Sequence, residues 1–301
     1  MTALATLATP TGPVGCLKIG EAFYSASAVA ALTGIALPAA VVDIVPVWAA
    51  LAEAIAAAEA LVVASLPPVA TLGDAAFLAP LLWPGKVLCA GANYYDHLAE
   101  MGMPGATKEG QRLFFFMKPP RQAVVGAGAT VRMPLDCEKF DWEIELAAVI
   151  GTTARAVPVE TALDHVAGYT VALDLSARDK NQAPDQFYKL DWVAGKANDT
   201  TCPLGPWIVP ASAIPDPQNV GLKLSLNGDV KQDGSSRDMI FSVAEQIAIA
   251  SRIMTLEPGD VLLTGTPAGV GVPKGAFLAR GDTIEATIEG IGTLTVSVRP
   301  D

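Results

Sequence analysis

Positive charge is scarce in this sequence. Its 301 residues include 20 lysines and arginines against 31 aspartates and glutamates, which gives a formal net charge of −11 and a pI near 4.6. This balance argues against nucleic acid and against anionic membranes as partners, because both repel an acidic surface. An anionic substrate would therefore need a local positive site, made by a metal ion or by individually placed lysine and arginine side chains.

Paired cysteines and a basic leader are missing as well. The four cysteines are Cys16, Cys89, Cys137 and Cys202. They lie far apart, without a C-x-x-C pair or histidines at zinc spacing, which predicts reduced and mostly buried thiols. The N-terminus lacks the basic start of a signal peptide, and prolines and carboxylates interrupt the apolar region 28–69. We therefore expect no spanning helix, no membrane partner and a cytoplasmic location.

What the chain has in quantity is apolar residues, which make up 51% of it at a mean hydropathy of +0.39. Such a chain is globular, and 301 residues suffice for two units. We expect a small N-terminal α/β domain over 1–80, with its clearest helix at 47–64, and a larger domain over 86–301. The larger domain is predicted to be mostly β, so that the fold class is α+β. Its expected strands are 86–91, 113–117, 140–151, 168–174, 206–209, 222–226, 261–263, 283–288 and 293–298.

The stretch 140–151 alternates apolar and acidic residues at its start. Its carboxylates are Asp141, Glu143 and Glu145. Alternation is typical of a β-strand with one face in the core, and side chains two apart on a face stand about 7 Å apart. Two interpretations are open from this stretch alone: a solvated strand face, or a site at which the carboxylates share an ion.

A further carboxylate, Asp174, ends the apolar strand 168–174. It either pairs with Arg178, caps a helix, or binds a metal, since a buried acid is otherwise costly. Together with Glu143 and Glu145 it offers an all-oxygen site, which suits Mg²⁺ or Mn²⁺ better than zinc.

The chain has only two histidines. His165 lies on an expected helix and is interpreted as structural. His97 follows a glycine-ended strand and precedes a glycine-rich loop, 101–111, and Glu100 lies three residues further on, on the same helical face. The pair is either a surface contact or a general base oriented by a carboxylate. The glycines of 265–271 do not form a dinucleotide loop, because Pro267 and Pro273 would break the required helix.

These residues, taken in order, resemble the fumarylacetoacetate hydrolase family. The resemblance rests on Asn93-Tyr94 with His97 and Glu100, 115–120, 142–146, Gly168-Tyr169, Asp174 with 176–179, 205–207, Asn227-Gly228 and 256–271. It runs from about residue 86 to the end of the chain in one consistent order. It implies a mixed β-roll catalytic domain, a homodimer and a Mg²⁺ or Mn²⁺ cofactor.

The resemblance also implies roles for individual residues. The metal ligands would be Glu143, Glu145 and Asp174, whereas Asp141 would stay on a solvated face as a neighbour of the site. The catalytic residues would be the dyad of His97 and Glu100, which activates water, and Lys196, which holds an anionic oxygen of the substrate. The substrate-binding residues would be Arg178, Gln182, Gly265 and Thr266, although Asn181 competes with Gln182 for its place. No carboxylate stands at 90–92, so three protein ligands are expected.

The function expected from this resemblance is that of a hydrolase dependent on a divalent metal. It would cleave a C–C bond of a 2-keto or 1,3-dicarbonyl acid, such as an acylpyruvate of aromatic catabolism. A His–Glu pair would activate water, and the leaving enolate would be stabilised by the metal. The same site could serve an isomerase or a decarboxylase. A non-catalytic keto-acid-binding module would show a degraded pair or missing ligands, and a purely structural β-protein would not respond to metal.

Overall fold

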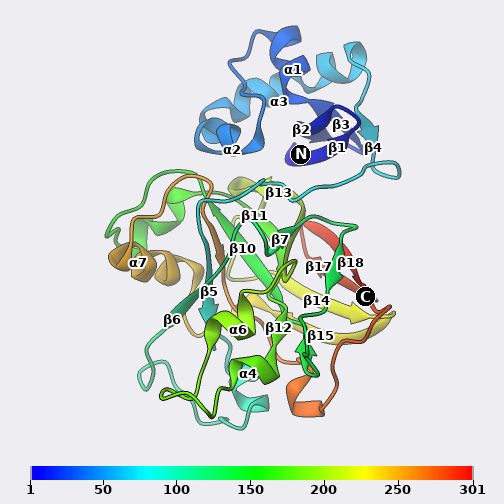
Figure 1. Ribbon diagram of the computed structural model, residues 1–301. Coiled ribbons are helices and arrows are strands. Elements are labelled where there is room, and N and C mark those ends of the chain that lie inside the picture. The colour runs from blue at the N-terminus through cyan, green and yellow to red at the C-terminus, as the bar shows by residue number, and fades with distance from the viewer. Residues whose placement is uncertain (1, 300–301) are drawn as a thin grey trace.

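The computed structural model describes residues 2–299. A small N-terminal part lies at one end of the molecule and a larger, β-rich part at the other (Figure 1). The N-terminal part contains β1 (Ala3–Thr9), β2 (Gly12–Ile19), β3 (Ala22–Ser25), α1 (Ala26–Thr33), α2 (Val41–Ile44), η1 (Val45–Val47), α3 (Trp48–Ser65) and β4 (Ala70–Thr71).

The larger part is built mainly from strands. They are β5 (Val87–Gly91), β6 (Phe114–Lys118), β7 (Val124–Val125), β8 (Thr130–Arg132), β9 (Phe140–Asp141), β10 (Ile144–Ile150), β11 (Val166–Leu173), β12 (Ser176–Ala177), β13 (Cys202–Pro210), β14 (Gly221–Leu226), β15 (Asp229–Ser235), β16 (Val261–Leu263), β17 (Thr283–Ile288) and β18 (Gly292–Arg299). Its helices are α4 (Tyr95–Glu100), η2 (Val159–His165), α5 (Arg178–Asn181), α6 (Trp192–Lys196), η3 (Ala211–Ala213), η4 (Ser236–Asp238), α7 (Val243–Ile253) and η5 (Val272–Lys274). The mostly β, α+β class predicted from the sequence is confirmed.

Two mixed sheets organise the molecule. The larger has the order β4-β3-β2-β1-β13-β11-β10-β16-β5-β6, with β7 also pairing β13, and the smaller has the order β15-β14-β17-β18-β8. Most neighbours are antiparallel, whereas β16 runs parallel to β5 and β18 parallel to β8. The N-terminal strands join the large sheet where β1 pairs β13. The boundary between residues 80 and 86 stays a prediction, as do the homodimer and the cytoplasmic location.

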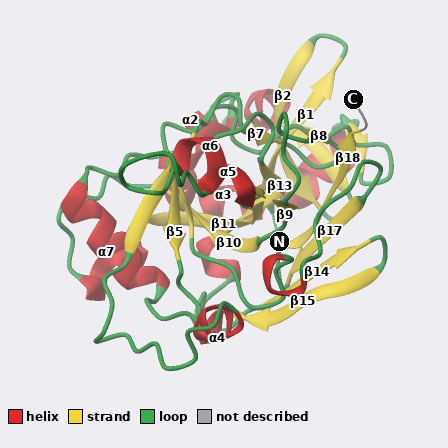
Figure 2. Ribbon diagram, turned by 60° about the horizontal axis from the view of Figure 1, so that its bottom comes forward, coloured by secondary structure: helices red, strands yellow, loops and turns green. Residues whose placement is uncertain are grey.

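Strand β10 is buried on both faces, because each face meets a different core. Ile144, Leu146, Ala148 and Ile150 pack with side chains of β14, β17 and β18. Ala147 and Val149, on the opposite face, pack in a second core with residues of β1, β2 and α3. In Figure 2, β14, β17 and β18 lie to one side of β10 and β11. Helix α7 contributes Val243, Ile247 and Ala250 to the same core as these strands. A side chain on either face of β10 is therefore removed from water.

The apolar stretch 41–65 differs from the expectation. Its length and composition alone would allow it to cross a membrane, because the mean hydropathy of its apolar 18-residue stretch is 1.8. Pro46 does not interrupt the helical path, because it stands in the first turn of η1, where a missing N–H is tolerated. Trp48, Ile55 and Val62 of α3 pack into the core.

The acidic stretch is not one continuous strand, contrary to the prediction. It breaks at Trp142 and Glu143 into β9, which pairs β12, and β10, which pairs β11 and β16. Side chains bind the backbone at the break: Trp142 N donates to Asp141 Oδ1, and Ile144 N donates to Gln232 Oε1 at 3.0 Å. The backbone N–H groups of these two residues therefore both have hydrogen-bond acceptors, although they lie outside the strand ladder.

Candidate metal and acid–base site

Three carboxylates meet where β10 begins and β11 ends. Glu143, Glu145 and Asp174 are at most 5% exposed, and one oxygen of each lies within 4.8 Å of the others. Glu143 lies in the break before β10, Glu145 is the second residue of β10, and Asp174 directly follows β11. Asp174 N donates to Glu143 O at 2.9 Å, which holds the two side by side. The grouping predicted from the sequence is present in the fold.

Two cations contact Glu143, and one of them also contacts Asp174. Lys196 Nζ, at the end of α6, lies 2.7 Å from Glu143 Oε2 and 2.6 Å from Asp174 Oδ2. Arg178 Nη2 lies 2.5 Å from Glu143 Oε1. Burial alone would raise the pKa of Glu143, but Arg178 and Lys196 together outweigh it and hold that pKa well below its usual range. Burial would lower the pKa of Lys196, but Asp174 and Glu143 raise it overall.

Glu145 forms no ion pair with any described residue. Burial raises its pKa well above the usual range, and the charges of Asp174 and Glu143 raise it further. The charge of Lys196 offsets this rise only in part, and a hydrogen bond from Gly265 N to Glu145 Oε2 at 2.6 Å adds to that compensation. The fold thus places a third carboxylate beside two others without a matching positive side chain.

These carboxylates suit a hard divalent cation. Asp174 Oδ1 accepts no hydrogen bond within the described residues, although Lys118 Nζ is 2.9 Å away, and Glu145 repels its neighbours. Glu145 is the carboxylate that stays without an ion pair among the described residues, and a buried charge of that kind is costly unless a cation approaches it. Oxygen ligands are those preferred by Mg²⁺ and Mn²⁺. The donor set therefore fits such an ion.

The histidine and glutamate predicted as a pair are in contact. His97 Nδ1 and Glu100 Oε1 on α4 are 2.9 Å apart. Glu100 Oε2 also accepts the N–H of Gly269 at 2.8 Å, which ties α4 to the turn after β16. Gly269 has a φ of +111°, and a Cβ there would lie 2.1 Å from Lys231 O, so the turn needs glycine at this position. His97 is 8% exposed, which is unlike a surface pair.

A cavity of about 150 Å³ joins these groups. His97, Glu143, Glu145, Asp174, Arg178, Lys196, Asn181 and Thr266 all line it. Gln182, predicted as a substrate contact, is exposed, and its backbone instead forms an isolated β-bridge with Leu190. Asn181 is the one of the two that reaches the cavity. Gly265 contributes its N–H to Glu145, while Thr266 Oγ1 donates to Ile144 O.

Asp141 corrects the sequence interpretation, which left it on a solvated face. It is fully buried, and its carboxylate accepts Arg178 Nε at 3.0 Å and Gly271 N at 2.7 Å. Arg178 thus bridges Asp141 and Glu143. Asp141 thereby fixes the orientation of the guanidinium at the edge of the carboxylate cluster.

Sequence reasoning missed Lys118, at the end of β6. Its ammonium group is buried and donates to the carbonyl oxygens of Leu175, Lys196 and Thr201 at 2.9, 2.7 and 3.0 Å. Its distance to Asp174 Oδ1 is 2.9 Å, without the direction of a hydrogen bond. Lys118 therefore ties the segment that carries Asp174 to the end of the helix that carries Lys196.

Replacing Lys118 by methionine is expected to destabilise the fold by about 3–5 kcal/mol, because the change leaves a buried carboxylate and three carbonyls without their cation. The free energy of unfolding in urea measures this. Lys223→Met is the matched control, because Lys223 pairs Asp233 on the surface at 3.1 Å with both side chains exposed. Its expected loss is under about 1 kcal/mol. Equal losses in the two variants would contradict the role given to Lys118.

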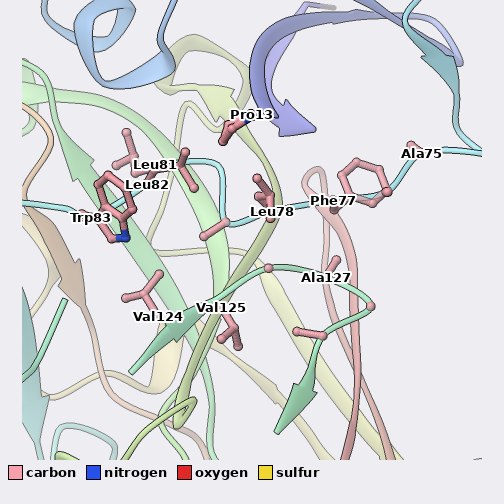
Figure 3. A pocket seen from close by; sticks show the side chains of 15 residues that line it. Pro13, Ala75, Phe77, Leu78, Leu81, Leu82, Trp83, Val124, Val125 and Ala127 are labelled. Carbon is pink, nitrogen blue, oxygen red and sulfur yellow. The ribbon is translucent and has the colours of Figure 1, made fainter. Parts of the chain in front are cut away.

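A larger cavity, of about 690 Å³, lies elsewhere. Figure 3 shows it between the side chains of Phe77, Leu81 and Trp83 and those of Val124 and Val125. None of the described residues that line it can ionise, and none is a predicted site residue. Size alone therefore does not locate the chemistry, which needs the charged groups of the smaller cavity.

The comparisons with known proteins agree with this geometry. Residues 86–299 match the family model described as fumarylacetoacetate (FAA) hydrolase C-terminal. A 2,4-didehydro-3-deoxy-L-rhamnonate hydrolase of Sphingomonas sp. is 40% identical over 80% of this chain and 82% of its own. Human mitochondrial oxaloacetate tautomerase FAHD2B is 40% identical over 75% of this chain and 70% of its own.

A solved structure also resembles this chain over nearly its whole length. Maleylpyruvate hydrolase from Sphingobium sp. SYK-6, crystallised with manganese (II) ion and pyruvate, superposes with a TM-score of 0.76 at 30% identity, covering 99% of both chains. The chain belongs to the fumarylacetoacetate hydrolase family, as the resemblance of its motifs predicted, and it is an enzyme.

Proposed function

We propose that this enzyme hydrolyses the C–C bond of an acylpyruvate, a 2,4-dioxo acid, with Mg²⁺ or Mn²⁺ as its cofactor. The observation that carries the proposal is the cavity that holds both a buried carboxylate triad and a His–Glu pair. The triad alone would serve any metal-assisted enolisation. Hydrolysis additionally needs a base for water, which His97 supplies.

Glu143, Glu145 and Asp174 would hold the metal. When bound, a divalent ion supplies positive charge to the substrate's carboxylate and 2-keto oxygens and stabilises the negative charge that develops there. Lys196, whose ammonium now lies between Glu143 and Asp174, donates to an anionic oxygen of the substrate. Arg178 keeps Glu143 in place through its second contact with Asp141.

His97 takes the proton from water. Its Nδ1 is engaged with Glu100, so Nε2 is the ring nitrogen that accepts. The water oxygen bonds to the 4-keto carbon, and the bond between carbons 3 and 4 breaks. Its electron pair remains with the pyruvate fragment as an enolate, and the proton taken up by His97 then reaches carbon 3. The products are pyruvate and the carboxylic acid of the acyl group.

A tautomerase is the second candidate. It is favoured by relatives named oxaloacetate tautomerases, such as the human protein at 40% identity. This reaction uses the same triad and moves one proton between carbon and oxygen, without adding water. The two reactions differ in whether the imidazole acts on water or only on substrate.

Acetylpyruvate, tested after removal of bound metal and again after addition of Mn²⁺ or Mg²⁺, separates the two candidates. We expect pyruvate and acetate in equal amounts, formed only with metal, as measured by coupled reduction of pyruvate and by chromatography of acetate. Metal-dependent enolisation of oxaloacetate without cleavage of any acylpyruvate would instead establish the tautomerase. Activity that survives chelation would overturn both.

A further inference from the structure

The cavity is divided into a charged part and an apolar part. Its cations are Arg178 and Lys196, and each is held by two carboxylates. Among the described residues that line the cavity, the rest of the wall has an uncharged polar portion and an apolar portion. The polar portion is Asn93, His97, Asn181 and Thr266, and the apolar portion is formed by small residues of 90–92 and by Leu98, Met101, Met103, Phe114, Phe116 and Trp192. All permanent charge is therefore gathered at the end where the carboxylate and 2-keto group of a substrate would bind.

The apolar wall begins directly beside the charged end. Lys196 Nζ lies 5.0 Å from the centroid of the Phe116 ring. Phe116 stacks on Trp192 with centroids 5.3 Å apart and planes at 18°, and Phe114 contacts the same indole at 5.2 Å. Phe116, Trp192 and Phe114 thus form a series of ring contacts that begins beside the ammonium group. A substrate whose anionic oxygens meet Lys196 would place its acyl group along them.

Phe114 limits the length of that wall. A Cβ on Gly91 would lie 2.0 Å from Phe114 Cζ, so the tip of the ring rests on the backbone of β5 where a side chain is absent. With Trp192 on its other side, the ring spans from β5 to α6. The cavity that remains is about 150 Å³, well below the ~300–1,000 Å³ of sites for drug-sized ligands.

We infer, on the basis of the proposed function, that the site takes 2-keto acids whose distal group is short and uncharged, and that Phe114 sets the permitted length. A second carboxylate on the substrate would lie against Leu98, Met101 and Phe114 without a cation. Met101 and Phe114 are 38% and 39% exposed, so such a carboxylate would keep part of its water, but these side chains offer neither a charge nor a hydrogen bond to replace the water that it loses. The substrate class is therefore a monocarboxylic acylpyruvate, such as acetylpyruvate or propionylpyruvate, rather than a dicarboxylic one.

Binding of two inert keto acids tests the charge preference independently of cleavage. 2-Oxopentanoate and 2-oxoglutarate have the same chain length and differ by a terminal methyl or carboxylate. Calorimetry on the Mn²⁺-loaded protein is expected to show at least about tenfold tighter binding of 2-oxopentanoate. Equal affinities, or tighter binding of 2-oxoglutarate, would overturn the inference even in a protein that cleaves acetylpyruvate. Failure to cleave any acylpyruvate would overturn the proposed function instead.

Two variants test the residues. Met103→Arg, on an exposed loop position, is expected to make 2-oxoglutarate bind more tightly than 2-oxopentanoate, because it supplies the missing cation, whereas Met103→Leu leaves the ratio of the two affinities unchanged.

Phe114→Ala is expected to raise the affinity for 2-oxooctanoate relative to 2-oxopentanoate by roughly tenfold, because the loss of the ring lengthens the cavity. Phe187→Ala, which removes a ring that is 88% exposed and does not line the cavity, is the control. An unchanged ratio in Phe114→Ala would exclude Phe114 as the end of the site.

Discussion

Glu145→Gln is expected to abolish metal-dependent activity while leaving the metal-free fold at least as stable as the wild type. The carboxylate is buried, its pKa is raised by burial and by Asp174 and Glu143, and its recorded hydrogen bond comes from Gly265 N. Because the folded pKa lies above the unfolded value, the ionised form of Glu145 costs stability at pH values above about 4.5. Glutamine keeps an acceptor for Gly265 and removes that cost.

The expected loss of activity is large. Without one of three ligands, kcat/KM should fall by on the order of 10³, which corresponds to about 4 kcal/mol. Calorimetric titration with Mn²⁺ should show a parallel loss of affinity, and the melting temperature of the metal-free variant at pH 7 should equal or exceed that of the wild type. Unchanged Mn²⁺ affinity would remove Glu145 from the site.

Glu143→Gln is the contrasting control. Glu143 accepts from both Arg178 and Lys196, and its pKa is depressed, so its ionised form contributes stability at neutral pH that is lost as the pH falls through the folded pKa. The amide leaves two buried cations without that charge. We therefore expect the same loss of activity as in Glu145→Gln, but with a lower melting temperature. Opposite stability effects with a common functional defect would separate metal binding from folding.

The residues that could be predicted from the sequence are those whose spacing already carries their chemistry. His97 and Glu100 are three apart on a helix, and Glu143 and Glu145 are two apart beside a strand, so local geometry brings each pair together. Asp174 could be predicted to join them because it ends a buried strand. The family resemblance added Lys196, which no local pattern connects to the carboxylates. It also gave a substrate-binding role to Arg178, which the sequence suggested only as a partner of Asp174.

Burial could not be predicted in the same way. Alternation along 140–146 separates two faces of a strand, but it does not reveal that each face meets a core. Asp141 was assigned to solvent for this reason. The break at Trp142 depends on Gln232, which arrives from β15, a strand absent from the predicted elements. Asn227-Gly228, with φ of 52° and 86°, is the two-residue turn that could have predicted the β14–β15 hairpin.

Lys118 is a part of the site that the sequence could not predict. Its local sequence, between a run of phenylalanines and two prolines, is typical of a strand end, where a lysine ordinarily reaches water. Its burial is decided by Leu175, Lys196 and Thr201, which lie 57 to 83 residues away along the chain. No periodicity or motif in the sequence connects these positions. Only the packed fold makes the lysine part of the site's support.

His97→Gln is expected to separate water activation from enolate formation. The amide removes the base but not the metal ligands, so cleavage of acetylpyruvate should fall by about 10²–10⁴ while metal-dependent exchange of the carbon-3 protons continues. Proton NMR in deuterated water measures exchange and cleavage in one sample. Parallel loss of both activities would mean that the imidazole also removes the carbon-3 proton of the intact substrate, as a tautomerase requires.

Glu100→Gln distinguishes the imidazole from its orienting partner. Glu100 accepts from Gly269 N as well as contacting His97, and a glutamine can keep the Gly269 bond through its carbonyl oxygen. The turn after β16 should then stay in place, so the melting temperature should change little. The smaller fall in cleavage, compared with His97→Gln, would measure what the carboxylate contributes by fixing the ring's tautomer. If Glu100→Gln cleaved acetylpyruvate at the wild-type rate, the pair would be a structural link between α4 and the turn, and the base would have to be another group in the cavity.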